Sequence, residues 1–323
     1  MSKFLVTGCA GFIAAKVASM LLAEGHDVVG VDNLNDYYDV SLKNHRLELL
    51  QSPSFNFHKL DIEDGDKVDA LFDEYQFDAI FNLAARAGVR YSMENPHVYL
   101  STNALGSLNL LESMRKHSAK KLILASTSSL YAGLEMPFSE DLPVNTPISS
   151  YAASKKAAEM LAYSHHHLYD IDVSICRYFT VYGPAGRPDM CIFRFIKWID
   201  QEEPIELFGD GTQARDFTFV DDIARGTIAA SKPVGFEVFN LGGGGVPVTL
   251  LQIIEKLEAL LGKKAVLNHK TFHKADIKIT QADIEKAKRL LGWHPKVDLD
   301  TGLQECVDWY QHQKPWSASI ELP

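Results

Sequence analysis

The stretch FLVTGCAGFIAAK, residues 4–16, decides the fold. The apolar run 4–7 predicts a buried strand, and the spacing of apolar residues after it predicts a helix over about 12–24. Gly8, Gly11 and Ala14 form a GxxGxxA arrangement between the two. Glycines here let the backbone approach a pyrophosphate, and a helix N-terminus supplies free N–H groups, so the pattern predicts a dinucleotide site. The cofactor contacts expected in this stretch are Gly8, Gly11, Phe12 and Ile13.

An acidic residue stands where a dinucleotide site needs one. Asp32 ends the next predicted strand, 27–31, twenty-four residues after Gly8. A carboxylate there accepts hydrogen bonds from the adenosine ribose and repels a 2′-phosphate, so the sequence favours NAD over NADP. Two weaker signals are an acid after the third strand and the small residues of FNLAA, which would let a cofactor lie close. The further contacts expected are Asn33, Asp61, Ile62, Leu83, Ala84 and Ala85.

Short apolar runs alternate with helix-length segments through the first half of the chain. Further strands are expected at 55–57, 79–81, 122–125 and 173–175. Such alternation is typical of a parallel sheet with helices on both faces. The predicted fold is α/β, a Rossmann-type doubly wound parallel sheet with a smaller C-terminal α/β lobe.

The pattern changes after about residue 183. Turns marked by proline and glycine, such as 242–245, separate shorter elements, and helical spacing returns at 250–261, 284–291 and 301–311. We expect a cofactor-binding domain over 1–180 and a substrate-binding lobe over 181–323, with some elements interleaved.

Composition narrows the class of partner. The chain has 323 residues, of which 46% are hydrophobic, and a formal net charge of −10. This charge argues against nucleic-acid and anionic-membrane partners. Four scattered cysteines without a CxxC pair predict reduced thiols, and no apolar stretch is long enough to span a membrane, so we expect a cytoplasmic protein. Consecutive histidines at 165–167 would point about 100° apart on a helix, so we expect no metal site.

A tyrosine and a lysine stand four residues apart in SSYAASKKAAEML, residues 149–161. Tyr151 and Lys155 therefore project from one helix face. A nearby ammonium and the positive nicotinamide of bound NAD⁺ favour the phenolate, which makes a base for an alcohol that loses hydride. Upstream, the apolar run 122–125 ends in four hydroxyl residues with no acid among them: Ser126, Thr127, Ser128 and Ser129.

Together these features resemble the extended short-chain dehydrogenase/reductases, which are NAD-dependent nucleotide-sugar epimerases, dehydratases and decarboxylases. The resemblance covers essentially the whole chain, through RDFTFVDDIA (215–224) and ADIEKAKRLLGWHPK (282–296). Within that family, three stretches are similar to the UDP-glucuronate 4-epimerases: DNLNDYYDVSLKNHRL (32–47), ARAGVRYSMENP (85–96) and RYFTVYGPAGRPDM (177–190).

The resemblance implies 4-epimerisation of a UDP-sugar, UDP-glucuronate to UDP-galacturonate, by a homodimer paired through helices. A tightly held NAD⁺ would be reduced and reoxidised within one turnover. Tyr151 would take the proton from the sugar O4 as hydride leaves C4, and the 4-keto sugar would turn and take the hydride back on its other face. Lys155 would orient the nicotinamide ribose and Thr127 would hydrogen-bond the reacting oxygen. Ser126, Tyr151 and Lys155 complete the implied cofactor contacts.

The hydroxyl row separates the sister reactions. Related dehydratases and decarboxylases carry acids after the threonine, where this chain has Ser128 and Ser129. A uronate oxidised at C4 is a β-keto acid, which loses CO₂ when its carboxylate bond lies perpendicular to the carbonyl plane. Hydroxyls of Ser128, Ser129 and Thr180 could hold the carboxylate out of that geometry without like-charge repulsion. A strand end that satisfies its own backbone is the structural alternative.

The nucleotide is expected to meet arginines. A guanidinium suits phosphate geometry, so Arg215 is expected on a diphosphate oxygen, with an ion pair to Asp216 or Asp210 as the alternative. Two residues depart from the family pattern: His273 at an expected nucleotide contact, and Arg86 where the epimerases often have glutamine. The other substrate contacts expected are Arg90 and Arg187.

Alternative functions remain open on the same residues. Within the enzymes, they are a UDP-glucose or UDP-N-acetylglucosamine 4-epimerase and a UDP-glucuronate decarboxylase. An oxidoreductase that releases NADH and a silent NAD-sensing regulator are further alternatives. The Thr127, Tyr151 and Lys155 trio argues against the regulator, which has no use for it.

Overall fold

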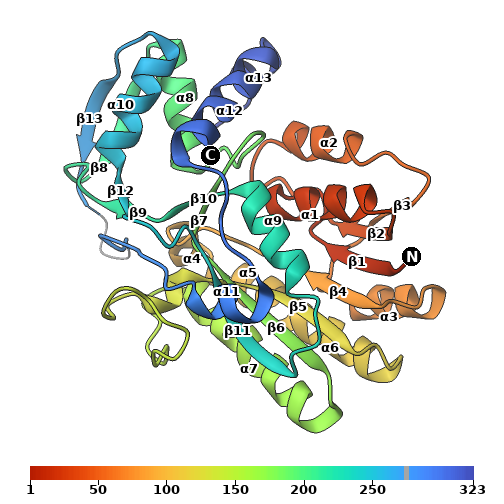
Figure 1. Cartoon of the computed structure of the whole chain (residues 1–323). Helices are drawn as coiled ribbons and strands as arrows, with labels where there is room; N and C mark the ends of the chain where they lie inside the picture. Colours follow the sequence, from red (N-terminus) through yellow and green to blue (C-terminus); the bar gives the residue numbers. More distant parts are fainter. Residues whose placement is uncertain (273–275) are drawn as a thin grey trace.

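A seven-stranded parallel sheet forms the centre of the molecule in the computed structural model, which describes residues 1–272 and 276–323. The strands run in the order β11-β6-β5-β4-β1-β2-β3. In that order their bounds are Phe236–Leu241, Asp172–Tyr178, Lys121–Thr127, Ala79–Asn82, Lys3–Thr7, Asp27–Asp32 and Phe55–Lys59. The predicted doubly wound α/β fold is confirmed (Figure 1).

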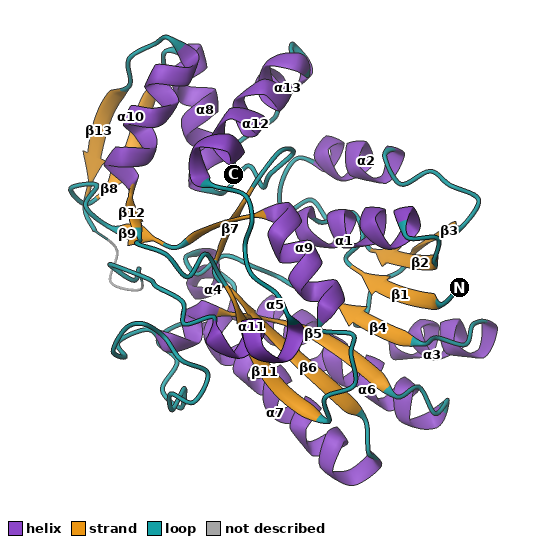
Figure 2. Ribbon diagram, viewed as in Figure 1, coloured by secondary structure: helices purple, strands orange, loops and turns teal. Residues whose placement is uncertain are grey.

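Helices cover both faces of this sheet (Figure 2). Successive residues of a strand point to opposite faces, which explains why β1 is apolar on both sides. Val6 joins one apolar cluster and Leu5 joins the other. The Val6 cluster includes residues of α1 (Phe12–Ala23), α2 (Val40–Glu48) and α9 (Val220–Ala229), and the Leu5 cluster includes residues of α3 (Gly65–Glu74), α6 (Gly106–Lys116) and α7 (Ser150–Tyr169).

A smaller lobe, at the upper left of Figure 1, has its own core. Ile196, Ile253 and Val307 bring together α8 (Cys191–Gln201), α10 (Leu250–Leu261) and α12 (Leu299–His312). Three strand pairs complete its connections: β7 (Thr180–Tyr182) with β10 (Phe217–Phe219), β9 (Ala214–Arg215) with β12 (Val248–Thr249), and β8 (Pro204–Phe208) with β13 (Val266–Lys270). Short helices are α4 (Tyr91–Glu94), α5 (Pro96–Tyr99), η1 (Leu100–Leu105), η2 (Ser128–Tyr131), α11 (Glu285–Leu291) and α13 (Trp316–Ser319).

The predicted elements are present, with shifts at their ends. The helix expected at 250–261 has those bounds, whereas the strand expected at 122–125 extends over Lys121–Thr127. Strand β11 was not among the predicted elements; it comes from the second half of the chain and pairs with β6, with Phe236 opposite Val173. Among the described residues, no helix is long and apolar enough to cross a membrane.

Candidate active site

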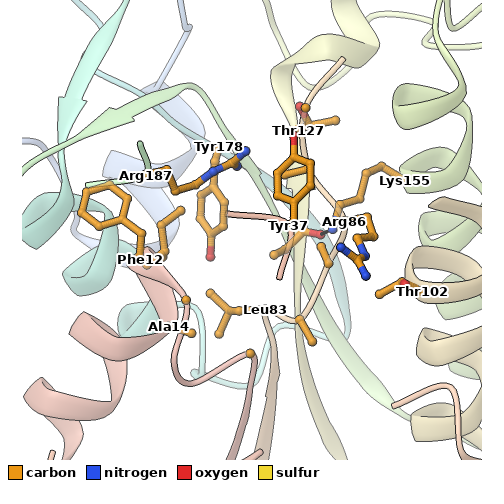
Figure 3. Close-up of a pocket in the computed structure, with 18 of the residues that line it drawn as sticks. Phe12, Ala14, Tyr37, Leu83, Arg86, Thr102, Thr127, Lys155, Tyr178 and Arg187 are labelled. Carbon is orange, nitrogen blue, oxygen red and sulfur yellow. Dashed lines mark hydrogen bonds between the residues drawn. The ribbon is translucent and has the colours of Figure 1, made fainter. Parts of the chain in front are cut away.

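A cavity of about 360 Å³ opens at the carboxyl ends of the central strands. In the sheet, β2 and β4 lie on opposite sides of β1, which makes the end of β1 a topological switch point. Doubly wound sheets bind their ligands at such points. The cavity lies between side chains from both parts of the chain, with Phe12 and Arg187 on the left of Figure 3 and Arg86 and Thr102 on the right. Every predicted site residue lines it except Arg90 and Arg215.

The loop after β1 leaves no room for side chains at its glycines. Gly8 has a φ of +69°, and a Cβ there would lie 2.8 Å from the Cα of Ala84. A Cβ on Gly11 would lie 2.8 Å from the carbonyl oxygen of Gly8. The first turn of α1 has no side-chain cap, so its N–H groups can donate to a ligand. This arrangement fits the pyrophosphate of a dinucleotide.

Asp32 lies buried at the next strand end. Its carboxylate accepts hydrogen bonds from the N–H groups of Ala10, at 3.2 Å, and Leu34, at 2.8 Å. Lys43, from α2, places its Nζ 3.8 Å from Asp32 Oδ1 and also lines the cavity. Asn33 donates a hydrogen bond of 2.7 Å to Asp61, which brings two further predicted contacts together.

Tyr151 and Lys155 lie on α7, which Ser149 caps by accepting a hydrogen bond from Ala152 N–H. Lys155 Nζ donates a hydrogen bond of 2.9 Å to the carbonyl oxygen of Ala125. Burial lowers the pKa of Lys155 to about 8, against the effect of a nearby carboxylate. Burial raises the pKa of Tyr151, and the nearby hydroxyl of Thr127 and the charge of Arg187 only partly oppose this. Without ligands, the phenol is therefore the stable form of Tyr151.

The four hydroxyls at 126–129 do not act alike. Ser126 donates a hydrogen bond of 2.6 Å to the buried carboxylate of Glu159, a partner that no sequence pattern indicated. Thr127 Oγ accepts from Ser129 N–H at 3.1 Å, which is the local backbone pairing weighed as the structural alternative. Ser128 and Ser129 line the cavity half-buried, and their hydroxyls make no hydrogen bond within the described part of the chain. Those two hydroxyls can therefore donate to a ligand.

The predicted arginines divide into two groups. Arg187 lines the cavity and pairs with Asp189, Nε to Oδ1 at 2.9 Å. Arg90 and Arg215 lie outside the lining. Arg90 pairs with Asp276 at 2.6 Å, whereas the guanidinium of Arg215 donates to the carbonyl oxygens of Ala214 and Lys278.

Neither alternative partner weighed for Arg215 pairs with it. Asp216 accepts instead from the N–H groups of Ala282 and Gly244, and Asp210 accepts from Thr212. Arg86 lines the cavity and donates to Asn35 Oδ1 at 3.1 Å. His273 lies outside the described residues.

Tyr37, Lys43 and Tyr178 line the cavity without having been predicted. Tyr37 and Lys43 fall inside the stretch 32–47, whose similarity to a family was the only available signal. Their side chains reach the cavity because the chain folds back after β2, which no local spacing predicts.

Comparison with known proteins gives consistent matches. The model of the NAD-dependent epimerase/dehydratase family matches residues 4–242. A UDP-glucuronate 4-epimerase of Thermodesulfobacterium geofontis is 59% identical over 323 residues, the full length of both chains. A UDP-glucuronic acid 4-epimerase from Bacillus cereus, solved with UDP-glucuronic acid and NAD, superposes with a TM-score of 0.90 at 38% identity, covering 96% of this chain and 99% of that one. A UDP-glucose 4-epimerase from Thermotoga maritima, solved with UDP-glucose, gives 0.88 at 32%, with the same coverage.

Proposed function

The chain belongs to the NAD-dependent epimerase/dehydratase family, and from this premise we propose that it interconverts UDP-glucuronate and UDP-galacturonate by inverting carbon 4. The relatives from T. geofontis and B. cereus carry that activity in their names. The single observation that carries the proposal for this chain is the row of hydroxyls at 126–129, which lines the cavity and contains no acid.

The cofactor of this reaction is NAD, which accepts a hydride from the sugar and returns it within one turnover. Gly8, Gly11 and the first turn of α1 would hold its pyrophosphate. Asp32 would accept hydrogen bonds from the adenosine ribose. Lys155 makes one hydrogen bond to a described residue, so its ammonium group has further N–H groups. These would donate to the ribose beside the nicotinamide.

The proton chemistry would belong to Tyr151. As the phenolate, it would take the proton from O4 of the sugar and become the phenol, and it would later return that proton to O4 of the other epimer. Thr127, whose hydroxyl lies near Tyr151, would donate to the same sugar oxygen. Because burial raises the pKa of Tyr151, the positive charges of Lys155, Arg187 and the bound nicotinamide would be needed to favour the phenolate.

The carboxylate of the sugar would be held by neutral donors. Ser128, Ser129 and Thr180 line the cavity, and no acid stands among them. Their hydroxyls would keep the carboxylate bond near the plane of the C4 carbonyl and so suppress loss of CO₂. A glutamate in this position would repel the carboxylate instead. Arg187 would add a positive charge near the uronate or the diphosphate.

Arg90 and Arg215 would bind the nucleotide end of the substrate. Both guanidinium groups lie outside the cavity lining. Burial lowers the pKa of Arg215, and the charge of Arg90 adds to that effect. Two neighbouring guanidinium groups suit the negative charge of a diphosphate. Residues 1–180 would then hold the cofactor, and residues 181–323 would form most of the nucleotide-sugar lobe. The exception is β11, which belongs to the second range but lies in the central sheet.

We also propose a homodimer in the cytoplasm. Leu100 and Leu105 on η1 and Met160 and Tyr163 on α7 are 46–61% exposed, and α7 packs against η1. A second copy of the chain would cover this apolar face, with helices paired across the interface. The four cysteines are free, as expected in a reducing compartment.

The decisive experiment is incubation of the purified protein with UDP-glucuronate, without added cofactor, followed by proton NMR. UDP-galacturonate as the sole product is the expected result, with no net change in absorbance at 340 nm. UDP-xylose or a pentos-4-ulose would overturn the proposal in favour of decarboxylation. Turnover of UDP-glucose without turnover of UDP-glucuronate would assign the neutral sugar as substrate.

A further inference from the structure

A third side chain, Glu159, follows Tyr151 and Lys155 on the same face of α7. The three residues are spaced four apart, so they lie above one another along the helix. Glu159 and Lys155 are both buried, with 3% and 5% exposure. A buried carboxylate one turn from a buried ammonium calls for an explanation, because burying charge is costly unless it is compensated.

The carboxylate of Glu159 is fully engaged. Arg177, on β6, donates to both of its oxygens, Nε to Oε1 at 2.9 Å and Nη2 to Oε2 at 2.8 Å. Ser126 donates to Oε1 at 2.6 Å, and Lys156 lies 3.3 Å from Oε2. Burial raises the pKa of Glu159, but these donors outweigh it and the net pKa is lowered. Glu159 is therefore a stable anion at neutral pH.

Arg177 is itself held in place by a second set of groups. Its Nη1 donates to the hydroxyl of Tyr131 at 2.8 Å, and that hydroxyl donates to Asn240 Oδ1 at 2.8 Å. Arg177 also lies opposite Ser126 in the register of β5 and β6. The network thus joins α7, η2 and three strands of the sheet at one point below the cavity.

This network meets the reacting groups at the end of β5. Ser126 binds Glu159, while the preceding residue, Ala125, accepts the hydrogen bond of Lys155. The following residue, Thr127, has its hydroxyl near Tyr151 and lowers the pKa of that residue. The charge of the Glu159 carboxylate raises the pKa of Lys155 and so opposes the effect of burial, which lowers it.

We propose that Glu159 is a positioning residue that keeps Lys155 charged and holds the end of β5 in register with α7. The groups that face Glu159 are Arg177 from β6, Ser126 from β5 and Lys156 from α7, and those that face Lys155 are Glu159 and the Ala125 carbonyl. The effect of Glu159 on catalysis rests on the proposed function, because Glu159 would act through the role proposed for Lys155. The interaction between the charges of Glu159 and Lys155 does not depend on that function.

The test is a titration of Lys155 in the holoprotein. Protein labelled with [ε-¹³C]lysine would be titrated by NMR, and the signal of Lys155 assigned by its loss in Lys155→Met. In Glu159→Gln, which keeps the size of the side chain and one of its two acceptor oxygens, the pKa of Lys155 is expected to fall by about one unit, because the anion that favours the ammonium is gone. Glu159→Asp, which keeps the charge, is expected to titrate close to the original protein.

A matched control separates charge from loosened packing. Tyr131→Phe removes one hydrogen bond from Arg177 and changes no charge, so it is expected to lower Tm and to leave the titration of Lys155 unchanged. If Tyr131→Phe shifts Lys155 as much as Glu159→Gln does, the proposal is overturned. If Glu159→Gln lowers Tm but leaves Lys155 unchanged, Glu159 is structural only, which also overturns it.

Glu159→Gln leaves a buried guanidinium beside a neutral partner, so the variant could fail to fold. The double variant Glu159→Gln/Arg177→Met removes both charges and avoids this cost, and the pKa of Lys155 is again expected to fall. An unchanged value there overturns the proposal. Because NMR reads the lysine without turnover, a protein inactive on every UDP-sugar would refute the proposed function and still test this coupling.

Discussion

Nζ of Lys43 lies 3.8 Å from Oδ1 of Asp32, and both side chains are buried at the edge of the cavity. Burial lowers the pKa of Lys43, and the charge of Asp32 opposes that effect. The carboxylate expected to bind the adenosine ribose thus has a cation directly beside it. Rejection of a 2′-phosphate would therefore depend on the carboxylate of Asp32, since Lys43 beside it would attract such a group.

Replacing Asp32 with serine is expected to shift cofactor preference toward NADP, because a 2′-phosphate would then meet Lys43 and no carboxylate. The ratio of Kd for NADP to Kd for NAD should fall at least about tenfold, which is about 1.4 kcal/mol. Calorimetric titration of the nucleotide-free protein measures both constants. The gain should disappear in Asp32→Ser/Lys43→Met, and an unaltered ratio in Asp32→Ser would contradict this role of Asp32.

Replacing Ser129 with glutamate tests the hydroxyl row. A carboxylate at this position would repel the uronate, so kcat/KM for UDP-glucuronate should fall by about 100-fold, and any product should include UDP-pentose. Ser129→Ala, which removes one neutral donor, should cost only about tenfold. Product analysis by proton NMR distinguishes the two effects. Epimerisation and carboxylate retention unchanged in Ser129→Glu would show that the row does not hold the carboxylate.

The activity should fall on the alkaline side as Lys155 loses its proton. Burial lowers the pKa of Lys155 to about 8, so its charge is present below that pH and is lost above it. We expect kcat/KM to decline about tenfold per pH unit above this point. Lys155→Arg, whose guanidinium stays charged, should be slower but should lack this decline. The same alkaline limb in Lys155→Arg would assign it to another group.

A charge on the exposed face of α7 should dissociate the dimer. Met160 is 61% exposed, so Met160→Glu is tolerated by the folded chain but would place a carboxylate in an apolar interface. Sedimentation velocity is expected to give a dimer for the original protein and a monomer for the variant. Leu290→Glu, at an exposed leucine on α11, serves as the control and should remain dimeric. A monomeric original protein would refute the proposed interface.

Local patterns predicted most of the fold and many of the residues that line the cavity. The glycine loop, the strand end at Asp32 and the pair Tyr151 and Lys155 are each defined by spacing within one strand or one helix, which backbone geometry fixes. Parallel strands bring their carboxyl ends to one edge of a sheet, which is why these separate signals meet at one cavity in the structure. Arg90 and Arg215 do not line the cavity, and their positions could not be predicted in this way. They lie in a loop and a short strand whose positions depend on the second lobe.

The amino-acid sequence by itself determined the strand–loop–helix units, the acid that favours NAD and the row of hydroxyls without a carboxylate, because these follow from residue type and periodicity. Only the tertiary structure decided what those residues touch. The sheet order places β6 beside β5, so Arg177 meets Ser126 and Glu159, and the fold-back after β2 places Lys43 beside Asp32. Such contacts join residues 11 to 51 positions apart, and no local pattern encodes which distant charge a buried group will meet.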